Sequence, residues 1–297
     1  MNKILNIIIL LSHLINIVHS NSVITILANN SNSMGNYMIA LDKVNKGSIS
    51  IRKIDNPSKS ISFTYQGDYI TCGAYYKCNL FETEPGMYEI KITTNEKALS
   101  LNGLIGGTYC NFDSAIIENS GDKINITDLS LAFSNCPKLK TVDLTNFDLS
   151  EVTNFKSFFY GCKNLVSVKF GNFKTEKLEN MYRMFWGCSN LLSLDLSPLD
   201  TSNVTNMEDL FKNCNNLRYL NLSTFDTSKV TSFLSMFYNC SSLTSLNLSN
   251  FMTPATLKMN EMFYYCEWLE NLNIENFNFS LVHNTSYMFY NCKKWLI

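Results

Sequence analysis

The cysteines are the residues in this chain whose type and spacing could support chemistry. Eight of the ten recur at intervals of 26 residues along the 297-residue sequence. They are Cys110, Cys136, Cys162, Cys188, Cys214, Cys240, Cys266 and Cys292. A metal site needs ligands that converge on one point, whereas a constant period arranges the thiols in a line. A disulfide requires two Cα atoms within about 7 Å, and packed helices would hold neighbouring copies about 8–10 Å apart. We therefore predict no metal site and expect these cysteines to be buried, reduced thiols that act as small hydrophobes.

The sequence contains few residues that could form a catalytic site. Two of the three histidines, His13 and His19, lie in the leader described below, which leaves only His283 in the rest of the chain. Nucleophile–histidine triads and histidine-based metal sites need such a residue beside its partners. The glycine-rich segment NGLIGGTYC (102–110) lacks the lysine and the spacing of a phosphate-binding loop. We predict that the protein is not an enzyme and needs no cofactor.

Further residues repeat in phase with the cysteines and indicate two kinds of element in each copy. In the copy around Cys214, apolar residues at i, i+3, i+4 and i+7 would share one face of a short helix. These are Met207, Leu210, Phe211 and Cys214. Leu220 and Leu222 then flank a polar residue, as in a half-buried strand. Neither element can bury its apolar face alone, but stacked copies would share one core. We predict an α/β solenoid with one strand and one short helix in each 26-residue repeat.

The repeats resemble a known family. The segment LTSLNLSNF (243–251) is similar to the leucine-rich-repeat consensus, and MFYNCSSLTSLNLSNF preceded by FDTSKVTSFLS (225–251) resembles the BspA-like leucine-rich-repeat surface proteins. The resemblance covers residues 107–297, with a degenerate first repeat at 107–132 and a truncated last repeat. It implies a curved solenoid that acts in cell-surface adhesion or protein interaction, and it implies no catalytic residues.

The first hundred residues lack the period. Residues 1–20 combine Lys3 with an apolar stretch and place Val18 and Ser20 at −3 and −1 of a cleavage point, as in a signal peptide. Residues 21–106 alternate apolar and polar side chains between turn residues, which predicts a β-rich N-terminal domain that covers the first repeat. Cys72 and Cys78 lie in this domain, outside the period, and we predict a disulfide between them because the chain is expected to be exported.

Two rows of side chains are candidates for ligand binding. The outward residues of the predicted strands form a polar row on the face expected to be concave: Asp143, Lys169, Asp195, Asn221, Asn247 and Asn273. An aromatic ladder follows the repeated phenylalanine and is interrupted at Lys212: Tyr160, Trp186, Tyr238, Tyr264 and Tyr290. Aromatic residues dominate binding hot spots. The alternatives are a solvated polar row and rings that pack on one another along the array.

Composition and charge restrict the function further. Hydrophobic residues make up 45% of the chain, charged residues 16%, and the net charge is −1, so the sequence gives no electrostatic reason to bind nucleic acid. No segment after the leader is apolar enough to span a bilayer. We predict a secreted or cell-surface protein that binds a protein or glycan on a cell surface or matrix. A self-assembling surface or coat component, associating through an uncapped C-terminal end, is the first alternative, and an intracellular scaffold is the second.

Overall fold

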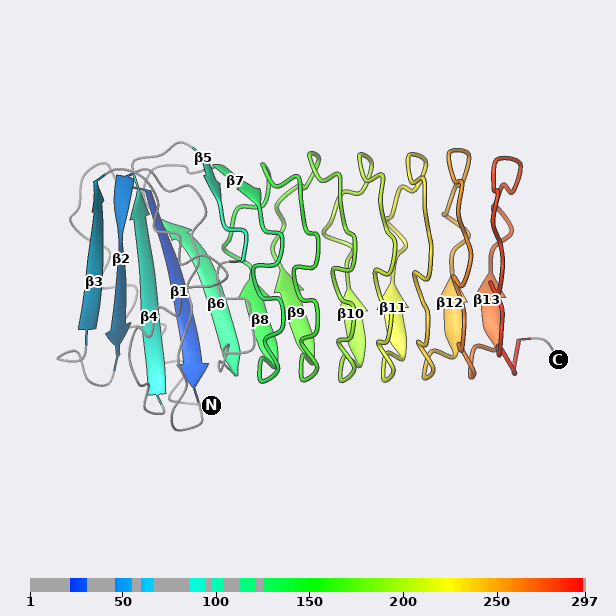
Figure 1. The fold of residues 1–297 in the computed structure, drawn as a ribbon, viewed down its shortest axis with the longest axis horizontal. Helices are drawn as coiled ribbons and strands as arrows, with labels where there is room; N and C mark the ends of the chain where they lie inside the picture. Colours follow the sequence, from blue (N-terminus) through cyan, green and yellow to red (C-terminus); the bar gives the residue numbers. More distant parts are fainter. Residues whose placement is uncertain are drawn as a thin grey trace.

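The computed structural model describes residues 22–30, 46–54, 60–66, 86–94, 98–103, 113–120 and 125–295. Its strands follow one another from a large sheet at one end of the molecule into a row of stacked coils (Figure 1). Their bounds are β1 (Ser22–Asn30), β2 (Lys46–Lys53), β3 (Ser60–Gln66), β4 (Gly86–Thr94), β5 (Ala98–Ser100), β6 (Ser114–Ser120), β7 (Asn125–Asp128), β8 (Thr141–Leu144), β9 (Ser167–Phe170), β10 (Ser193–Asp195), β11 (Tyr219–Asn221), β12 (Ser245–Asn247) and β13 (Asn271–Asn273).

The periodic part of the chain is a β-solenoid of about six turns with a repeat of about 26 residues. Strands of successive coils pair in parallel and in a register of one repeat, so that Ser193 lies opposite Tyr219 and Leu194 opposite Leu220. A second side of each coil is joined to the next by single parallel bridges, such as Asn206 with Ser232. The bridges join each coil to the next from Asp128 to Asn284, whereas the strands of the solenoid pair as β8–β9, β10–β11 and β12–β13. Equal coil length keeps each repeat position in one column.

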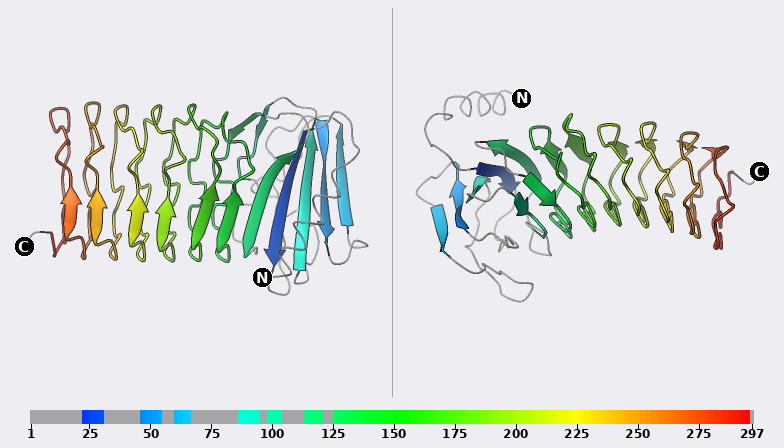
Figure 2. Two further views of the ribbon diagram at one scale, coloured as in Figure 1. Left: turned by 180° about the vertical axis from the view of Figure 1, so that it is seen from behind. Right: turned by 90° about the horizontal axis from the view of Figure 1, so that it is seen from above.

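The N-terminal strands continue into the solenoid through a single sheet. The seven strands are ordered β3-β2-β4-β1-β6-β8-β9. In this sheet β1 is antiparallel to β4 and β6, while β6 is parallel to β8. Figure 2 shows the same continuity from behind and from above. Because β1 pairs along the edge of β6, the backbone groups at the start of the solenoid are hydrogen-bonded rather than exposed, which is how a capping element protects a sheet edge.

The predicted short helix is absent: no helix occurs in the ranges that the structure describes. In its place each coil has a run of turns with left-handed residues four positions apart, such as Asp209 (φ 55°) and Asn213 (φ 64°). The backbone N–H of Asp209 donates to the carbonyl of Leu234 in the next coil, at 2.8 Å. An α-helix contains neither left-handed residues nor N–H groups directed at another segment. The α/β assignment was therefore wrong in its helix, although the four residues expected on its apolar face are all fully buried.

Columns of identical side chains fill the interior. Phenylalanine rings at one repeat position stack along the axis, with centroids 5.4–5.9 Å apart, from Phe133 through to Phe289. Buried threonines link neighbouring coils. The hydroxyl of Thr201, for example, donates to the Asp226 carbonyl and accepts from the Asp226 N–H, both at 2.9 Å. The stacked rings give burial without directionality, and the threonine bonds fix the position of one coil relative to the next.

Candidate functional site

The row of residues predicted as a ligand surface lies on the side of the coils formed by strands β8 to β13, which we call the strand side. Lys169, Asp195, Asn221 and Asn247 are exposed, and Asp143 and Asn273 are half-buried. The strands that carry these residues point the same way and lie in line along the rod (Figure 1). The structure thus brings the predicted residues together in a column, in the order of the repeats.

Most of these side chains also have a structural role. The Asp195 Oδ1 atom accepts a hydrogen bond from the Ser197 N–H at 2.9 Å, and the other Asp and Asn residues of the row make the same bond to the residue two positions on. Such Asx turns are a common way to leave a strand. Lys169 cannot accept this bond, and its copy has Gly171 two positions on, where an added Cβ would lie 2.3 Å from the Thr145 carbonyl oxygen. The row is therefore a set of strand-ending turns as well as a candidate surface.

The row nevertheless presents unused polar atoms. Each Asx turn occupies one oxygen, and no protein partner for the Asp195 Oδ2 or Asn247 Nδ2 atom occurs in the described part of the chain. Lys169 lies 3.7 Å from a carboxylate oxygen of Asp143, and the Asn221 amide reaches Asp195 at 3.5 Å. Because the turn bonds hold the side chains in place, the free atoms are presented in fixed positions, which lowers the entropy lost on binding.

The aromatic ladder is occupied mostly with itself. Tyr160 stacks on Trp186 with ring centroids 4.5 Å apart, and Tyr238, Tyr264 and Tyr290 form a second stack at 4.5 and 4.9 Å. Ring faces in contact with each other are not available to a ligand. This arrangement favours the alternative in which the rings pack along the array.

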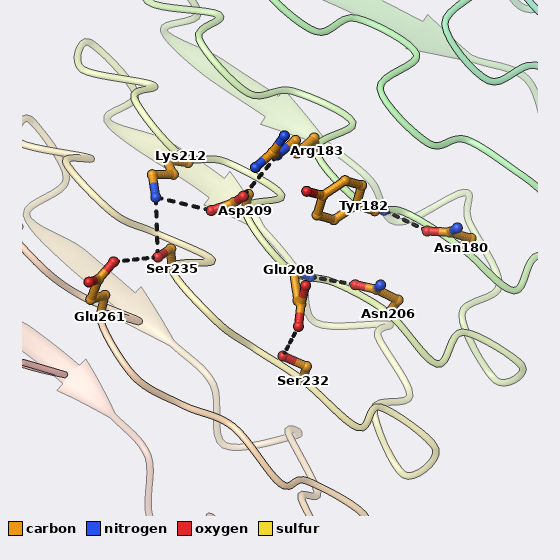
Figure 3. A network of polar contacts seen from close by, with 10 residues as sticks. All are labelled: Asn180, Tyr182, Arg183, Asn206, Glu208, Asp209, Lys212, Ser232, Ser235 and Glu261. Atoms are coloured by element: carbon orange, nitrogen blue, oxygen red, sulfur yellow. Dashed lines mark hydrogen bonds and ion pairs between the residues drawn. The ribbon is translucent and has the colours of Figure 1, made fainter. Parts of the chain in front are cut away.

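The interruption of the ladder is a polar network (Figure 3). Lys212 lies with its Nζ atom 4.3 Å from the Tyr238 ring centre and 3.2 Å from Oδ1 of Asp209. The other oxygen of Asp209 accepts a hydrogen bond from Nε of Arg183 at 2.9 Å. Ser235 extends the network by accepting from Lys212 and donating to Glu261. A cation thus replaces one ring of the column and is neutralised by a carboxylate that the sequence analysis did not single out.

The six periodic cysteines from Cys162 to Cys292 are free and buried, which confirms that part of the prediction. Each thiol donates to the carbonyl of a phenylalanine 29 residues earlier, as in Cys214 to Phe185 at 3.1 Å. Burial raises the pKa of the Cys162 thiol to about 12 and that of Cys292 to about 11. A thiol with so high a pKa is a poor nucleophile near neutral pH.

The prediction was wrong for Cys136, which is disulfide-bonded. Its partner lies outside the described residues, because the other described cysteines are free. The prediction assumes that cysteines of neighbouring copies lie on packed helices, about 8–10 Å apart. The coils instead stack through β-pairing, at about 4.8 Å, and this spacing does not by itself exclude a bridge.

Several predicted features lie outside the described residues: the signal peptide, Cys72, Cys78 and Cys110. In the ranges that are described, no three or more His, Cys, Asp or Glu side chains gather in a way that could hold a metal ion. No described segment is a helix with the length and hydropathy needed to cross a membrane.

One exposed residue on the strand side was missed by the sequence analysis. Tyr219 has 73% of its surface accessible and lies two residues before Asn221 on β11. The signal was present in the repeat, since the same position holds Thr141, Ser167, Ser193 and Ser245 in other copies. A large ring among small hydroxyl residues departs from the pattern of the column.

Comparison with known proteins identifies the repeats. Residues 108–216 and 189–296 match the family described as "Mycoplasma protein of unknown function, DUF285". The two matches together span residues 108–296, which is more than half of the chain. No curated protein matches the chain. The match supports a repeat family, but it does not carry the BspA-like name that the sequence resemblance suggested. The chain belongs to the DUF285 family.

Proposed function

We propose that this protein is a secreted or cell-surface binding protein whose partner docks on the strand side of the solenoid. The observation that carries the proposal is the row from Asp143 to Asn273, in which turn bonds orient exposed polar side chains while leaving some of their atoms free. The signal-peptide pattern in residues 1–20 supports export. The scarcity of histidine and the high thiol pKa values give no support to a catalytic role.

A binding screen against extracellular-matrix and host-surface proteins tests the proposal. For any protein captured, the variant Asp195→Asn with Lys169→Asn should weaken binding, because it removes both charges from the centre of the row. Asparagine at the same repeat position already ends β11 and β12, so the folded chain should tolerate both changes.

The matched control is Asp226→Asn, which removes a carboxylate that also makes a turn bond, to Ser228, at a different repeat position. We expect the control to bind as the wild type does and all variants to have the same melting temperature. Equal binding by the double variant and the wild type would place the interface elsewhere.

The second candidate is a self-assembling surface component. Phe279 and Leu281 in the last coil are 45% and 48% exposed and give that coil an apolar surface. Sedimentation velocity over a range of concentrations separates the two functions. Oligomers that grow with concentration and are abolished by Trp295→Asp support assembly, whereas a monomer at all concentrations supports the binding protein.

A further inference from the structure

Tyr219 differs from the other aromatic residues on the outside of the coils. The rings of the ladder stack on their neighbours, but no ring or cation packs on Tyr219 in the described part of the chain. Its partner across the β10–β11 pair is Ser193, and the next copy has Ser245 at this position. Because both are small, they leave the tyrosine ring standing out from the strand side, which agrees with its 73% exposure.

The polar atoms around this ring suit a ligand rich in hydroxyl groups. Asp195 offers a free carboxylate oxygen as an acceptor, and Asn247 offers a free amide N–H₂ as a donor. The hydroxyls of Ser193 and Ser245 can donate or accept. A hydroxyl group of a ligand also donates and accepts, so it can bond to every one of these atoms. The three coils that carry them span about 10 Å at about 4.8 Å per strand, which is the scale of a short oligomer of sugar rings.

The charge of this surface selects among such ligands. Residues 232–257 contain no Asp, Glu, Lys, Arg or His. Arg218, which precedes Tyr219 in the chain, and Asp195, which lies in the coil before it, are both exposed and carry opposite charges. A sulfated or carboxylated polymer would need a cluster of cations. Arg218 lies next to Tyr219 in the chain, and Lys169 lies two coils away and 3.7 Å from a carboxylate oxygen of Asp143, so these two cations do not form a cluster.

We infer that Tyr219, framed by Ser193, Asp195, Ser245 and Asn247, binds a neutral glycan. The apolar face of a sugar ring packs on the tyrosine, and its hydroxyl groups bond to the surrounding side chains. Tyrosine suits this role because it provides a large and rigid contact area with few rotatable bonds. The inference rests on the proposed function and names the chemical class of its ligand.

Affinity electrophoresis of the full chain in gels containing β-1,3-glucan, α-mannan or galactan tests the inference, with heparin as the charged comparator. We expect at least one neutral polysaccharide to retard the protein. Tyr219→Ser should weaken that retardation about tenfold, as expected for loss of one aromatic hot spot, and Tyr219→Phe should bind nearly as well as the wild type. The serine variant should fold normally because serine occupies this position in neighbouring coils.

Tyr287→Ser is the matched control, since Tyr287 is also exposed, at 64%, and serine occurs at its repeat position in Ser157 and Ser235. It should leave the retardation unchanged. Three outcomes overturn the inference: no retardation by any neutral polysaccharide, retardation by heparin alone, or equal retardation of Tyr219→Ser and the wild type. If the chain still captures a protein through the strand side in any of these cases, the proposed function stands and only the glycan inference fails.

Discussion

The carboxylate of Asp209 is the position where a single substitution tests the packing of the solenoid most directly. Its side chain is 6% exposed and lies between Nε of Arg183 at 2.9 Å and Nζ of Lys212 at 3.2 Å. The substitution Asp209→Ser removes the charge without changing the backbone requirement. Ser157 and Ser235 occupy the same repeat position with the same left-handed conformation, at φ of 56° and 52°.

The expected loss follows from the exposure of the two cations. A hydrogen bond to a charged group contributes about 1.5–3 kcal/mol, and removing one member of a fully buried ion pair costs about 3–5 kcal/mol. The side chains of Arg183 and Lys212 are 39% and 23% exposed, so both cations can turn toward water once the carboxylate is gone. We therefore expect the free energy of unfolding to fall by about 2 kcal/mol, toward the lower of these ranges.

A second substitution should recover the loss. With Lys212→Tyr added, the ladder would run without interruption from Tyr160 to Tyr290, with new ring contacts to Trp186 and Tyr238. Each stacked pair contributes about 0.5–1.5 kcal/mol, against about 0.5–1 kcal/mol for the cation–π contact of Lys212 that is lost. The ring contacts are the same in both chains that carry Lys212→Tyr, so they do not change the cost of Asp209→Ser there. We expect that cost to be about 1 kcal/mol less than in the wild type, because the ion pair between Asp209 and Lys212 is already lost in the Lys212→Tyr background.

Urea denaturation followed by circular dichroism measures all four chains of this cycle. Because a solenoid can unfold in parts, the midpoints are compared only where the slopes agree. A loss below about 0.5 kcal/mol for Asp209→Ser would refute the reasoning, because the buried carboxylate would then contribute no more than a surface ion pair. An equal loss in both backgrounds would show that Lys212 is not its effective partner.

Three further predictions follow from single repeat positions. Thiol reagents should react slowly with the native chain at pH 8, because burial raises the pKa of Cys162 to about 12 from 9.0. Fast labelling of the native chain would contradict the burial. The raised pKa also means that the stability contributed by this thiol is present below pH 9 and is lost as the pH rises from 9 toward 12. Alkaline unfolding followed by circular dichroism would detect that loss. Gly187→Ala should lower the melting temperature through a loss of about 1–2 kcal/mol in the free energy of unfolding. Gly187 has φ of 73°, and an added Cβ would lie no closer than 3.7 Å to another atom, so the backbone conformation and not a clash causes the loss. Gly187→Asn should cost less, and equal losses would mean that the left-handed backbone is not the cause. Thr201→Val should cost about 1–3 kcal/mol in urea unfolding by leaving the N–H and carbonyl of Asp226 without their partner. The control Thr224→Val, at an exposed site, should change little, and a similar loss in both would contradict the role given to the buried hydroxyl.

Much of the fold was accessible from the sequence. The period of 26 residues follows from the cysteines alone, and the alternation around Leu220 located β11 and its register against β10. The buried columns were also predictable, because a repeat can keep a phenylalanine or cysteine at one position only if that position faces a shared interior. All six residues of the polar row fall within strands, one in each of β8 to β13, as expected from the same alternation.

The helix was predicted wrongly because apolar spacing does not reveal backbone handedness. Residues 207–214 have the spacing of a helical face, and all four apolar members are buried, yet the segment is a run of turns. One sequence signal pointed against a helix: the residue before the cysteine is Gly or Asn in six of the seven copies from Asn135 to Asn291. Those residue types favour the left-handed conformation.

The sequence by itself determined that the chain is a stack of equal coils, because one hydrophobic pattern repeated without insertions can be buried only by its own copies. The tertiary structure alone decided how the coils touch. Backbone N–H groups that a helix would use internally are directed to the next coil, as from Asp209 to Leu234, and this choice depends on the neighbour being present. For the same reason the ring of Tyr219 could be recognised as free only after the ladder rings were seen to cover one another.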